Sequence, residues 1–304
     1  MKRSKILRHK FISLFPSWHF VEYVLLRTMM ELVNLLPITI STWLSRRMGD
    51  AMFLIVVSRR RVAISNLTIA FGDTKTDKEK RKIALESFRH LLTCYMELFR
   101  MPKFVKVSDK HVHLKNSEPI DNALARGKGI VLVMTHLGSW EYLSFIAKQK
   151  KCPATILGRI IKNPHIYKWV KSLRKIGGLE HRDKNMGIRW IFSELKKNHM
   201  VAIAIDQWAG NDGLWVDFFS VPTSTTSLPA RMAERTGCAL IPVYCLRVAS
   251  GEYELYVEPE IPFNKDDDNC IENTTKELNR IMERKIRAFP EQWMWTHKRW
   301  KGKK

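Results

Sequence analysis

One apolar segment followed by a polar turn limits the possible folds of this chain more than any other feature. Residues 129–134 read Gly-Ile-Val-Leu-Val-Met, and residues 135–141 continue as Thr-His-Leu-Gly-Ser-Trp-Glu. An apolar run of this length bounded by a turn is typical of a buried strand, and the pattern predicts a helix that opens near Gly138. His136 therefore lies at the carboxyl end of a strand, which is where open α/β sheets bind their ligands.

Strand-like and helix-like segments alternate beyond Gly127. We expect strands at 129–134, 153–158, 200–205, 238–247 and 252–259, and helices at 139–150, 163–176, 185–197, 225–236 and 269–288. This alternation predicts an α/β fold with a mostly parallel central sheet and helices on both faces. The last two strands, joined by Ser250-Gly251, can form a hairpin. Upstream, helical spacing of apolar residues extends from Thr76 to about Phe99.

An amphipathic, hydrophobic helical region precedes the sheet. The most apolar window, Trp18 to Leu36, contains three charges, Glu22, Arg27 and Glu31, which disfavours a membrane span. One side of this helix is apolar, so it can either lie in a membrane interface or pack on the protein's own core. With the basic leader at 1–10, it defines an expected membrane-associating region at 1–45, followed by the main domain at 46–304. The basic leader also places that domain on the cytoplasmic side of the membrane.

The net charge of +22 implies anionic partners. Nucleic acid, an anionic membrane face, acidic proteins and phosphorylated substrates all qualify. A nucleic-acid-binding protein would explain the charge but not the apolar first helix, and no recognition motif is present, so no nucleic acid is expected. Five cysteines without a Cys-x-x-Cys pair indicate reduced packing residues, and no metal site or cofactor is expected.

His136 and Glu141 form a candidate catalytic pair. On one continuous helix their side chains would point about 140° apart, but they can meet if His136 is in a loop and Glu141 in the first helical turn. Glu141 would then hold one ring nitrogen while the other takes a proton from a hydroxyl. The alternative is a strand-end histidine with a solvated glutamate at a helix start.

The residues around this pair resemble a known family. His136-Leu-Gly-Ser-Trp-Glu141 is similar to the His-x4-Asp/Glu signature of lysophospholipid acyltransferase-like enzymes, and more narrowly to the bacterial lipid A late acyltransferases. Thr135 stands where that family often has Asn or Ser. The resemblance covers roughly residues 20–301 and includes four further blocks in the right order: Arg60 to Phe71, Gly158 to Pro164 with Arg174 and Gly177, Ile205-Asp-Gln207 with Phe218-Phe219, and Glu291 to Trp300.

The resemblance implies an acyltransferase domain at 46–304. The implied reaction moves a fatty acyl chain from acyl carrier protein to a hydroxyl of a lipid A precursor at the cytoplasmic face of the inner membrane. His136 would be the general base and Glu141 its orienting partner. A lysophospholipid or another membrane lipid is the alternative acceptor, and a basic membrane- or nucleic-acid-binding protein is the alternative without catalysis.

Further residues are candidates for substrate binding. Arg159 follows the next strand and can contact the substrate or the oxyanion, Arg174 can do so or cap its own helix, and Asp206-Gln207 closes the strand Val201–Ile205 at the same edge or forms a local turn. Asn163 and Arg299 come from the matched blocks, and Arg299 can meet a phosphate. Ser139 offers a rival nucleophilic mechanism, but the Gly-x-Ser-x-Gly frame is absent.

Overall fold

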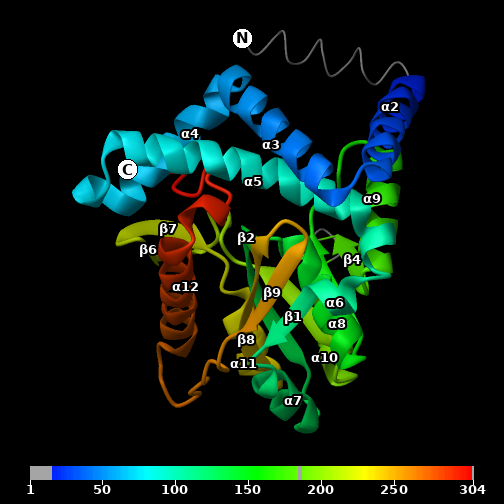
Figure 1. The fold of residues 1–304 in the computed structure, drawn as a ribbon. Helices are drawn as coiled ribbons and strands as arrows, with labels where there is room; N and C mark the ends of the chain where they lie inside the picture. Colours follow the sequence, from blue (N-terminus) through cyan, green and yellow to red (C-terminus); the bar gives the residue numbers. More distant parts are fainter. Residues whose placement is uncertain (1–15, 184–186, 303–304) are drawn as a thin grey trace.

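A computed structural model describes residues 16–183 and 187–302, so the basic leader at 1–10 lies outside the described residues. A seven-stranded sheet forms the centre of the protein, in the order β1-β9-β8-β2-β5-β3-β4 (Figure 1). All neighbouring strands are parallel except β8 and β9, which form the expected antiparallel hairpin. The predicted fold class is therefore confirmed. The strands of the sheet are β1 (Val112–Lys115), β2 (Ile130–Gly138), β3 (Ala154–Gly158), β4 (Leu179–Asp183), β5 (Met200–Ala204), β8 (Ala239–Ala249) and β9 (Glu252–Val257).

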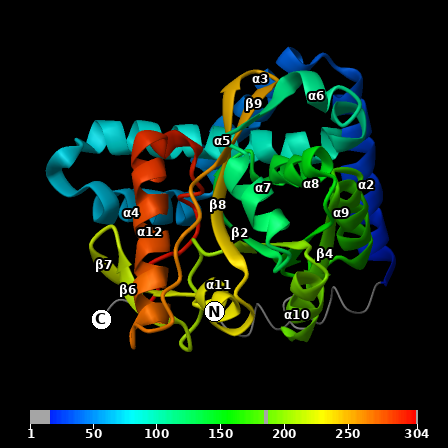
Figure 2. The same cartoon turned by 90° about the horizontal axis from the view of Figure 1, so that it is seen from below.

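Helices cover both faces of this sheet. Successive side chains of β2 point to opposite sides and are apolar on both, so each face needs a covering layer. Val131 and Val133 pack with α10, α11 and α12, whereas Leu132 and Met134 pack with α7 and α8. Figure 2 shows α12 on one side of β2 and β8, and α7 and α8 on the other. These helices are α7 (Glu118–Ala125), α8 (Ser144–Lys150), α10 (Arg189–Lys196), α11 (Leu228–Thr236) and α12 (Cys270–Ala288).

The long helix α5 (Asp77–Phe104) crosses the carboxyl edge of the central strands (Figure 1). A capping box starts it, since Thr76 accepts from the Glu79 amide and Glu79 accepts from the Thr76 amide. Its residues belong to the cores of both sheet faces, Phe88 to one and Leu91 to the other. The helix therefore forms a lid over the strand ends where the candidate site lies.

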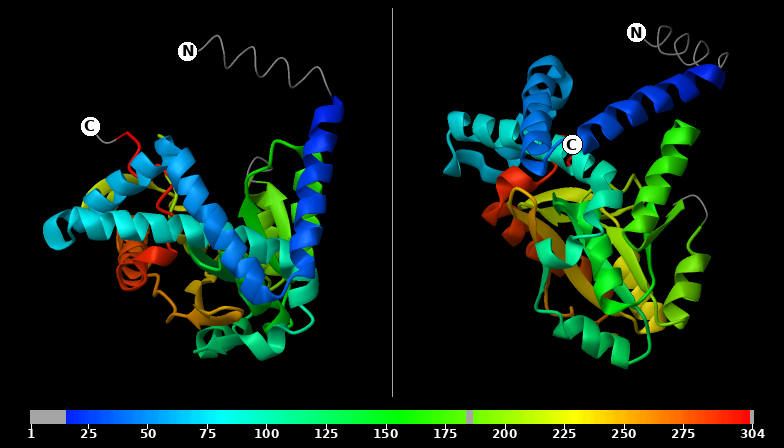
Figure 3. Two further views of the ribbon diagram at one scale, coloured as in Figure 1. Left: turned by 45° about the horizontal axis from the view of Figure 1, so that its top comes forward. Right: turned by 45° about the vertical axis from the view of Figure 1, so that its right-hand side comes forward.

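Three further helices lie outside α5 and the sheet. They are α2 (Pro16–Leu35), α3 (Ile38–Ile55) and α4 (Val57–Phe71). Helices α2 and α3 converge at the Leu36-Pro37 turn and form a V (Figure 3). The predicted domain boundary at residue 45 falls inside α3, which packs along α5 and belongs to the main body. Within residues 16–183 and 187–302, no helix is long and apolar enough to cross a membrane.

The predicted apolar side of α2 faces outward. Val21, Leu25 and Leu32 are exposed, as are Val24, Met29 and Leu35 of the same side. The inward side of α2 is partly apolar as well, because Met30 and Leu26 pack with Phe99 and Val170. On the same side Asn34 donates to the Phe99 carbonyl and Glu22 accepts from Asn163. The helix therefore packs on the protein through one apolar strip and leaves the predicted apolar side largely exposed, and contact of that side with a membrane interface stays a prediction.

The remaining elements are helix α9 and several short helices and strands. They are η1 (Gly72–Thr74), α6 (Ser108–His111), η2 (Trp140–Leu143), α9 (Pro164–Ile176), the antiparallel pair β6 (Leu214–Phe218) and β7 (Val221–Thr225), and η4 (Pro290–Gln292). The expected helix at 139–150 is a 3-10 turn followed by α8, and β1, β4, β6 and β7 were not expected from the sequence.

Candidate active site

His136 lies near the end of β2, where the strand becomes irregular. The register between β2 and β8 shifts between Met134 and Gly138. Gly138 adopts a positive φ of 66°, and a Cβ there would meet the Cys245 carbonyl oxygen at 1.8 Å, so only glycine fits. The irregular strand end turns the His136 ring out of the ladder, where it keeps 20% of its side-chain surface exposed.

The ring of His136 is held by Asp206. Nδ1 lies 2.9 Å from Asp206 Oδ1. A carboxylate only accepts hydrogen bonds, so Nδ1 carries the proton and Nε2 is left unprotonated as the basic nitrogen. This is the arrangement that a general base requires.

Asp206 is itself fixed by three more donors. Its Oδ2 accepts from the His136 amide at 2.8 Å, from Trp293 Nε1 at 2.8 Å and from Thr135 Oγ1 at 3.1 Å. Burial raises the pKa of Asp206, but the His136 ring and the hydrogen bonds that Asp206 accepts lower it by more. The net pKa lies below the usual value, so the group is a carboxylate. Burial lowers the pKa of His136, and the Asp206 charge with its hydrogen bond outweighs that and raises it.

The expectation that Glu141 orients His136 is wrong in its geometry. Glu141 forms a bidentate ion pair with Arg174, with Oε2 2.8 Å from Nε and Oε1 2.6 Å from Nη2. The indole of Trp140 lies between the two predicted partners: its ring centroid is 5.3 Å from the His136 ring, and its Nε1 donates to Glu141 Oε1. Glu141 is in the first turn after the strand as expected, but that turn points its carboxylate away from His136 and toward α9.

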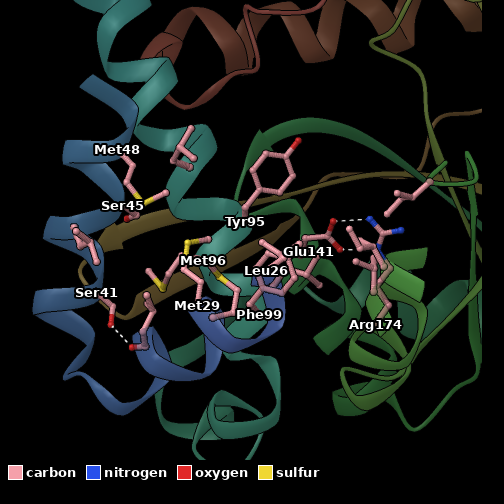
Figure 4. A pocket seen from close by; sticks show the side chains of 18 residues that line it. Leu26, Met29, Ser41, Ser45, Met48, Tyr95, Met96, Phe99, Glu141 and Arg174 are labelled. Carbon is pink, nitrogen blue, oxygen red and sulfur yellow. Dashed lines mark hydrogen bonds and ion pairs between the residues drawn. The ribbon is translucent and has the colours of Figure 1, made fainter. Parts of the chain in front are cut away.

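Glu141 and Arg174 also line a cavity. This cavity of about 380 Å³ lies between α2, α3, α5 and α9 and is lined mainly by aliphatic, methionine and aromatic side chains. In Figure 4 the ion pair lies at one side of the pocket, and Ser41, Ser45 and Met48 of α3 lie at the other. Burial raises the pKa of Glu141, but the adjacent Arg174 lowers it by more, so the net pKa is lowered. The ion pair therefore stays charged next to an apolar cavity. The volume falls within the roughly 300–1,000 Å³ of ligand pockets.

Other polar groups surround the open side of His136. Gln207 Nε2 lies 3.5 Å from His136 Nε2, a contact at the limit of a hydrogen bond. Burial lowers the pKa of His297 to about 4, and the charges of His136 and Arg159 lower it as well. Arg159 is exposed and follows β3, which is parallel to β5 and β2 and ends at the same edge of the sheet. The structure thus brings His136, Asp206 and Gln207 into contact and places Arg159 at the same edge, two strands from β2.

Two other residues predicted to bind substrate, Asn163 and Arg299, instead form hydrogen bonds within the protein. Asn163 caps α9 by accepting from the His165 and Ile166 amides, and it donates to the His19 carbonyl and to Glu22. Its amide therefore ties α9 to α2.

Arg299 is fully buried rather than available to a phosphate. It donates to the carbonyls of Gln207 and Ser224 and to the hydroxyl of Thr225, and its guanidinium lies over the Phe218 ring. Burial lowers its pKa to about 10. The expected phosphate contact by Arg299 is therefore wrong, and its function is to hold the 207 loop against the β6–β7 hairpin.

A buried polar network that the sequence did not predict supports the turn after His136. Arg247 Nε donates to Glu97 at 2.6 Å, its Nη1 lies 2.8 Å from His90 Nδ1, and its Nη2 donates to Ser139 Oγ at 3.2 Å. Ser139 is thus buried and bonded to Arg247, which argues against it as a nucleophile. His90 and Glu97 were detectable as polar residues within the apolar stripe of the helix that begins at Thr76.

The chain is similar to known proteins along most of its length. The family described as bacterial lipid A biosynthesis acyltransferase matches residues 15–302. The lipid A biosynthesis palmitoleoyltransferase of Escherichia coli (strain K12) is 26% identical over 271 residues, 88% of this chain and 86% of that protein. The lauroyltransferase of the same organism is 25% identical over 278 residues, 89% and 88% of the two chains. The phosphatidylinositol mannoside acyltransferase of Mycobacterium tuberculosis (strain CDC 1551 / Oshkosh) is 27% identical over 215 residues, 68% and 66% of the two chains.

Proposed function

Because the chain belongs to the bacterial lipid A biosynthesis acyltransferase family and is an acyltransferase, we propose that it moves a fatty acyl chain from acyl carrier protein to a hydroxyl of a lipid A precursor. The observation that carries this proposal is the pairing of His136 with Asp206 close to an apolar cavity. The Trp140 ring lies between His136 and Glu141, and Glu141 lines that cavity. A hydroxyl-directed base beside a space for a hydrocarbon chain is what acyl transfer between lipids requires.

The base in this reaction is Nε2 of His136. As the acceptor oxygen attacks the thioester carbonyl, Nε2 takes the hydroxyl proton, and Asp206 stabilises the imidazolium that forms. Collapse of the tetrahedral intermediate breaks the carbon–sulfur bond, and the departing thiolate receives the proton from Nε2. The products are an ester and a free thiol, and no covalent intermediate on the protein is needed.

Arg159 is the proposed cation for the oxyanion or for an acceptor phosphate. It is exposed and follows β3 at the carboxyl edge of the sheet, two strands from β2. The Ser139 amide is not available for the oxyanion, since it donates to the Cys245 carbonyl at 2.6 Å. Arg174 is not free either, because Glu141 neutralises it.

The apolar cavity is the proposed site of the acyl chain. Its lining contains few polar groups besides the Glu141–Arg174 pair and two serines of α3. The ion pair ties η2 to α9 and so fixes the wall of the cavity next to Trp140. Glu141 would then act on the reaction by shaping the pocket rather than by touching His136.

The donor and the location follow from charge and from the exposed helix. Acyl carrier protein is acidic, which suits a chain with a net charge of +22. The outward apolar side of α2 suits burial in the interface of the inner membrane at its cytoplasmic face. The cytoplasmic side is where acyl carrier protein is available.

The test is acyl transfer with three acceptors. Purified protein and acyl carrier protein thioester are incubated with a lipid A precursor, its dephosphorylated form or a lysophospholipid, and acylated product is measured by mass spectrometry. We expect the phosphorylated precursor to react fastest, because charge-assisted contacts to its phosphates add binding energy. Preference for the lysophospholipid would assign the alternative acceptor, and equal rates on all three would refute phosphate recognition.

A further inference from the structure

The corner between α3 and α4 exposes three aliphatic side chains that are near neighbours in the sequence, Leu54, Ile55 and Val57. Leu54 is 64% exposed and Ile55 78% exposed, and Val57, the first residue of α4, is exposed as well. Val56 breaks the helix with φ −89° and ψ 65°, so the chain turns sharply and presents these side chains at its tip. We name Leu54 to Val57 the α3–α4 corner. Contiguous exposed aliphatic side chains often mark a site of contact with a membrane or another protein.

Cations lie beside this corner. Arg61 of α4 faces Lys298 and Lys301 of the carboxyl-terminal segment across a groove of about 280 Å³ that contains no carboxylate. Within residues 16–183 and 187–302, neither Arg61 nor Lys298 forms an ion pair. We name this the Arg61 groove. Lys301 likewise has no ion pair among the described residues, and its ammonium lies over the Trp208 ring. The three cations present an attractive field to phosphate groups.

The Arg61 groove is joined to the catalytic edge of the sheet. Asn66, which lines the groove, donates to the carbonyls of Trp295 at 2.8 Å and of His297 at 2.6 Å. Arg59 donates to the Thr296 carbonyl. In the same segment, the Met294 amide donates to the His136 carbonyl at 3.2 Å. The corner and the groove are therefore held in a fixed position relative to the site.

The beginning of α2 lies on the same side of the molecule as the α3–α4 corner. Figures 1 and 3 show both at the top of the protein, with α2 and α3 converging below them. Trp18 and Phe20 are exposed at the upper end of α2. The apolar cavity lies deeper, between Leu26 to Val33 of α2 and Ser41 to Met48 of α3. A flat surface could therefore touch the upper end of α2 and the α3–α4 corner at the same time.

We propose that the α3–α4 corner is a second membrane contact, which inserts Leu54 and Ile55 into an anionic leaflet and binds lipid phosphates in the Arg61 groove. The proposal rests on the membrane location of the proposed function. A bilayer is the partner that needs both parts, because its interface offers an apolar layer and phosphates within a few ångströms of each other. An acidic protein would explain the cations alone, and nucleic acid would leave the aliphatic tip in water.

This second contact determines the orientation of the enzyme. If only α2 contacted the membrane, the protein could rotate about that helix. Contact at both α2 and the α3–α4 corner would fix the orientation of α2 and α3 relative to the leaflet. A membrane lipid could then move from the leaflet between α2 and α3 toward the site without crossing water.

The test measures binding of the full chain to vesicles by co-sedimentation, with phosphatidylglycerol vesicles against phosphatidylcholine vesicles. The aliphatic variant is Leu54→Ser with Ile55→Ser, and its matched control is Ile176→Ser with Ile188→Ser, which are also exposed aliphatic residues. We expect the corner variant to bind anionic vesicles at least about tenfold more weakly and the control to bind as the unmodified protein does.

The charge variant replaces Arg61, Lys298 and Lys301 with glutamine. Its control replaces Lys128, Lys196 and Arg235, exposed cations that precede β2, β5 and β8 at the opposite edge of the sheet. Loss of the groove cations should weaken binding to anionic vesicles about fivefold per cation, on the order of 100-fold for three, with little change on neutral vesicles. The control should change binding far less, although its net charge is the same.

Equal binding by corner variant, groove variant and controls would overturn the proposal. So would a groove variant that keeps vesicle binding but loses binding to acyl carrier protein, since the groove would then be a protein-docking site. Circular dichroism should show the same folding for all variants, because every changed side chain is surface-exposed. Acyl transfer by the unmodified protein to a detergent-dispersed acceptor tests the proposed function separately, so the two can fail independently.

Discussion

Replacement of Asp206 with asparagine tests which carboxylate controls His136. In the native site Oδ2 accepts three hydrogen bonds, from the His136 amide, Trp293 Nε1 and Thr135 Oγ1, while Oδ1 alone accepts from the His136 ring. An asparagine can keep the first three only by placing its amide oxygen there. Its NH2 group then faces Nδ1 of His136.

This orientation forces the wrong tautomer. Nδ1 must accept from the new NH2 group, so a neutral ring carries its proton on Nε2, where the base is needed. Loss of a general base typically costs about 10²- to 10⁴-fold in rate, and we expect Asp206→Asn to fall within this range. Folding should be largely retained, because three of the four hydrogen bonds persist.

The pH profile gives a second readout. Burial lowers the pKa of His136, and the negative charge of Asp206 more than offsets this in the native protein. The active form is the unprotonated ring, so kcat/KM falls as the pH drops through the His136 pKa. Removal of the Asp206 charge leaves burial unopposed, so the acid limb of the residual activity should move to lower pH.

The assay is initial-rate acyl transfer from acyl carrier protein thioester across pH, with Asp121→Asn as control. This control makes the same chemical change at Asp121 of α7, whose half-exposed carboxylate pairs with Lys150 of α8. A folded Asp206→Asn protein with near-native turnover and an unchanged acid limb would refute the assignment of Asp206 as the positioning residue of His136.

Four further outcomes follow from the contacts of the site. Glu141→Gln should leave Arg174 buried without its counter-charge and lower the free energy of unfolding by about 3 kcal/mol in urea titrations. It should move the acid limb of kcat/KM less than Asp206→Asn does, and a larger shift would identify Glu141 as the partner of His136. Arg299→Met should leave the Gln207 carbonyl without its side-chain donor and the Ser224 carbonyl with only the Ala209 amide, which should cost about 1–3 kcal/mol in the same titration. An unchanged urea midpoint would contradict the structural function of this arginine. Ser45→Leu should fill part of the cavity and shift the preferred acyl donor to shorter chains, with about 0.8 kcal/mol lost per displaced methylene; an unchanged chain-length profile would place the acyl chain elsewhere. Arg159→Ala should lower turnover sharply, and Arg159→Lys should restore only part of it if the contact is bidentate, whereas full activity of the alanine variant would exclude Arg159 from substrate and oxyanion binding.

Local sequence patterns predicted the fold and the position of the site. The apolar run before His136 predicted β2, and alternation of strands and helices predicted the parallel sheet, because both depend on periodicity that neighbouring residues carry. The short strands β6 and β7 were missed because neither has a clear apolar alternation: β6 buries only two of its five residues, and β7 buries three polar residues in a row, Thr223 to Thr225. His136 was placed at the strand end from the same local pattern.

The partners within the site were less predictable, because they depend on contacts distant in sequence. Asp206 lies 70 residues from His136 and meets it only because β2 and β5 are neighbours with their carboxyl ends together. Arg299 belongs to a basic tail and yet is fully buried, which charge patterning does not reveal. Helical periodicity likewise located the apolar side of α2 but could not show that this side faces away from the protein.

Direct observation of the transfer tests the central claim, that His136 removes the hydroxyl proton of a glycolipid acceptor during acyl transfer. Purified protein and its His136→Ala variant are incubated with acyl carrier protein thioester and a lipid A precursor, and the mass of the acceptor is followed over time. We predict that the acceptor gains the mass of one acyl chain with the native protein, and that the folded variant is slower by about 10²- to 10⁴-fold. Acylation by the variant at a near-native rate, or no acylation of the precursor by the native protein, would contradict the account.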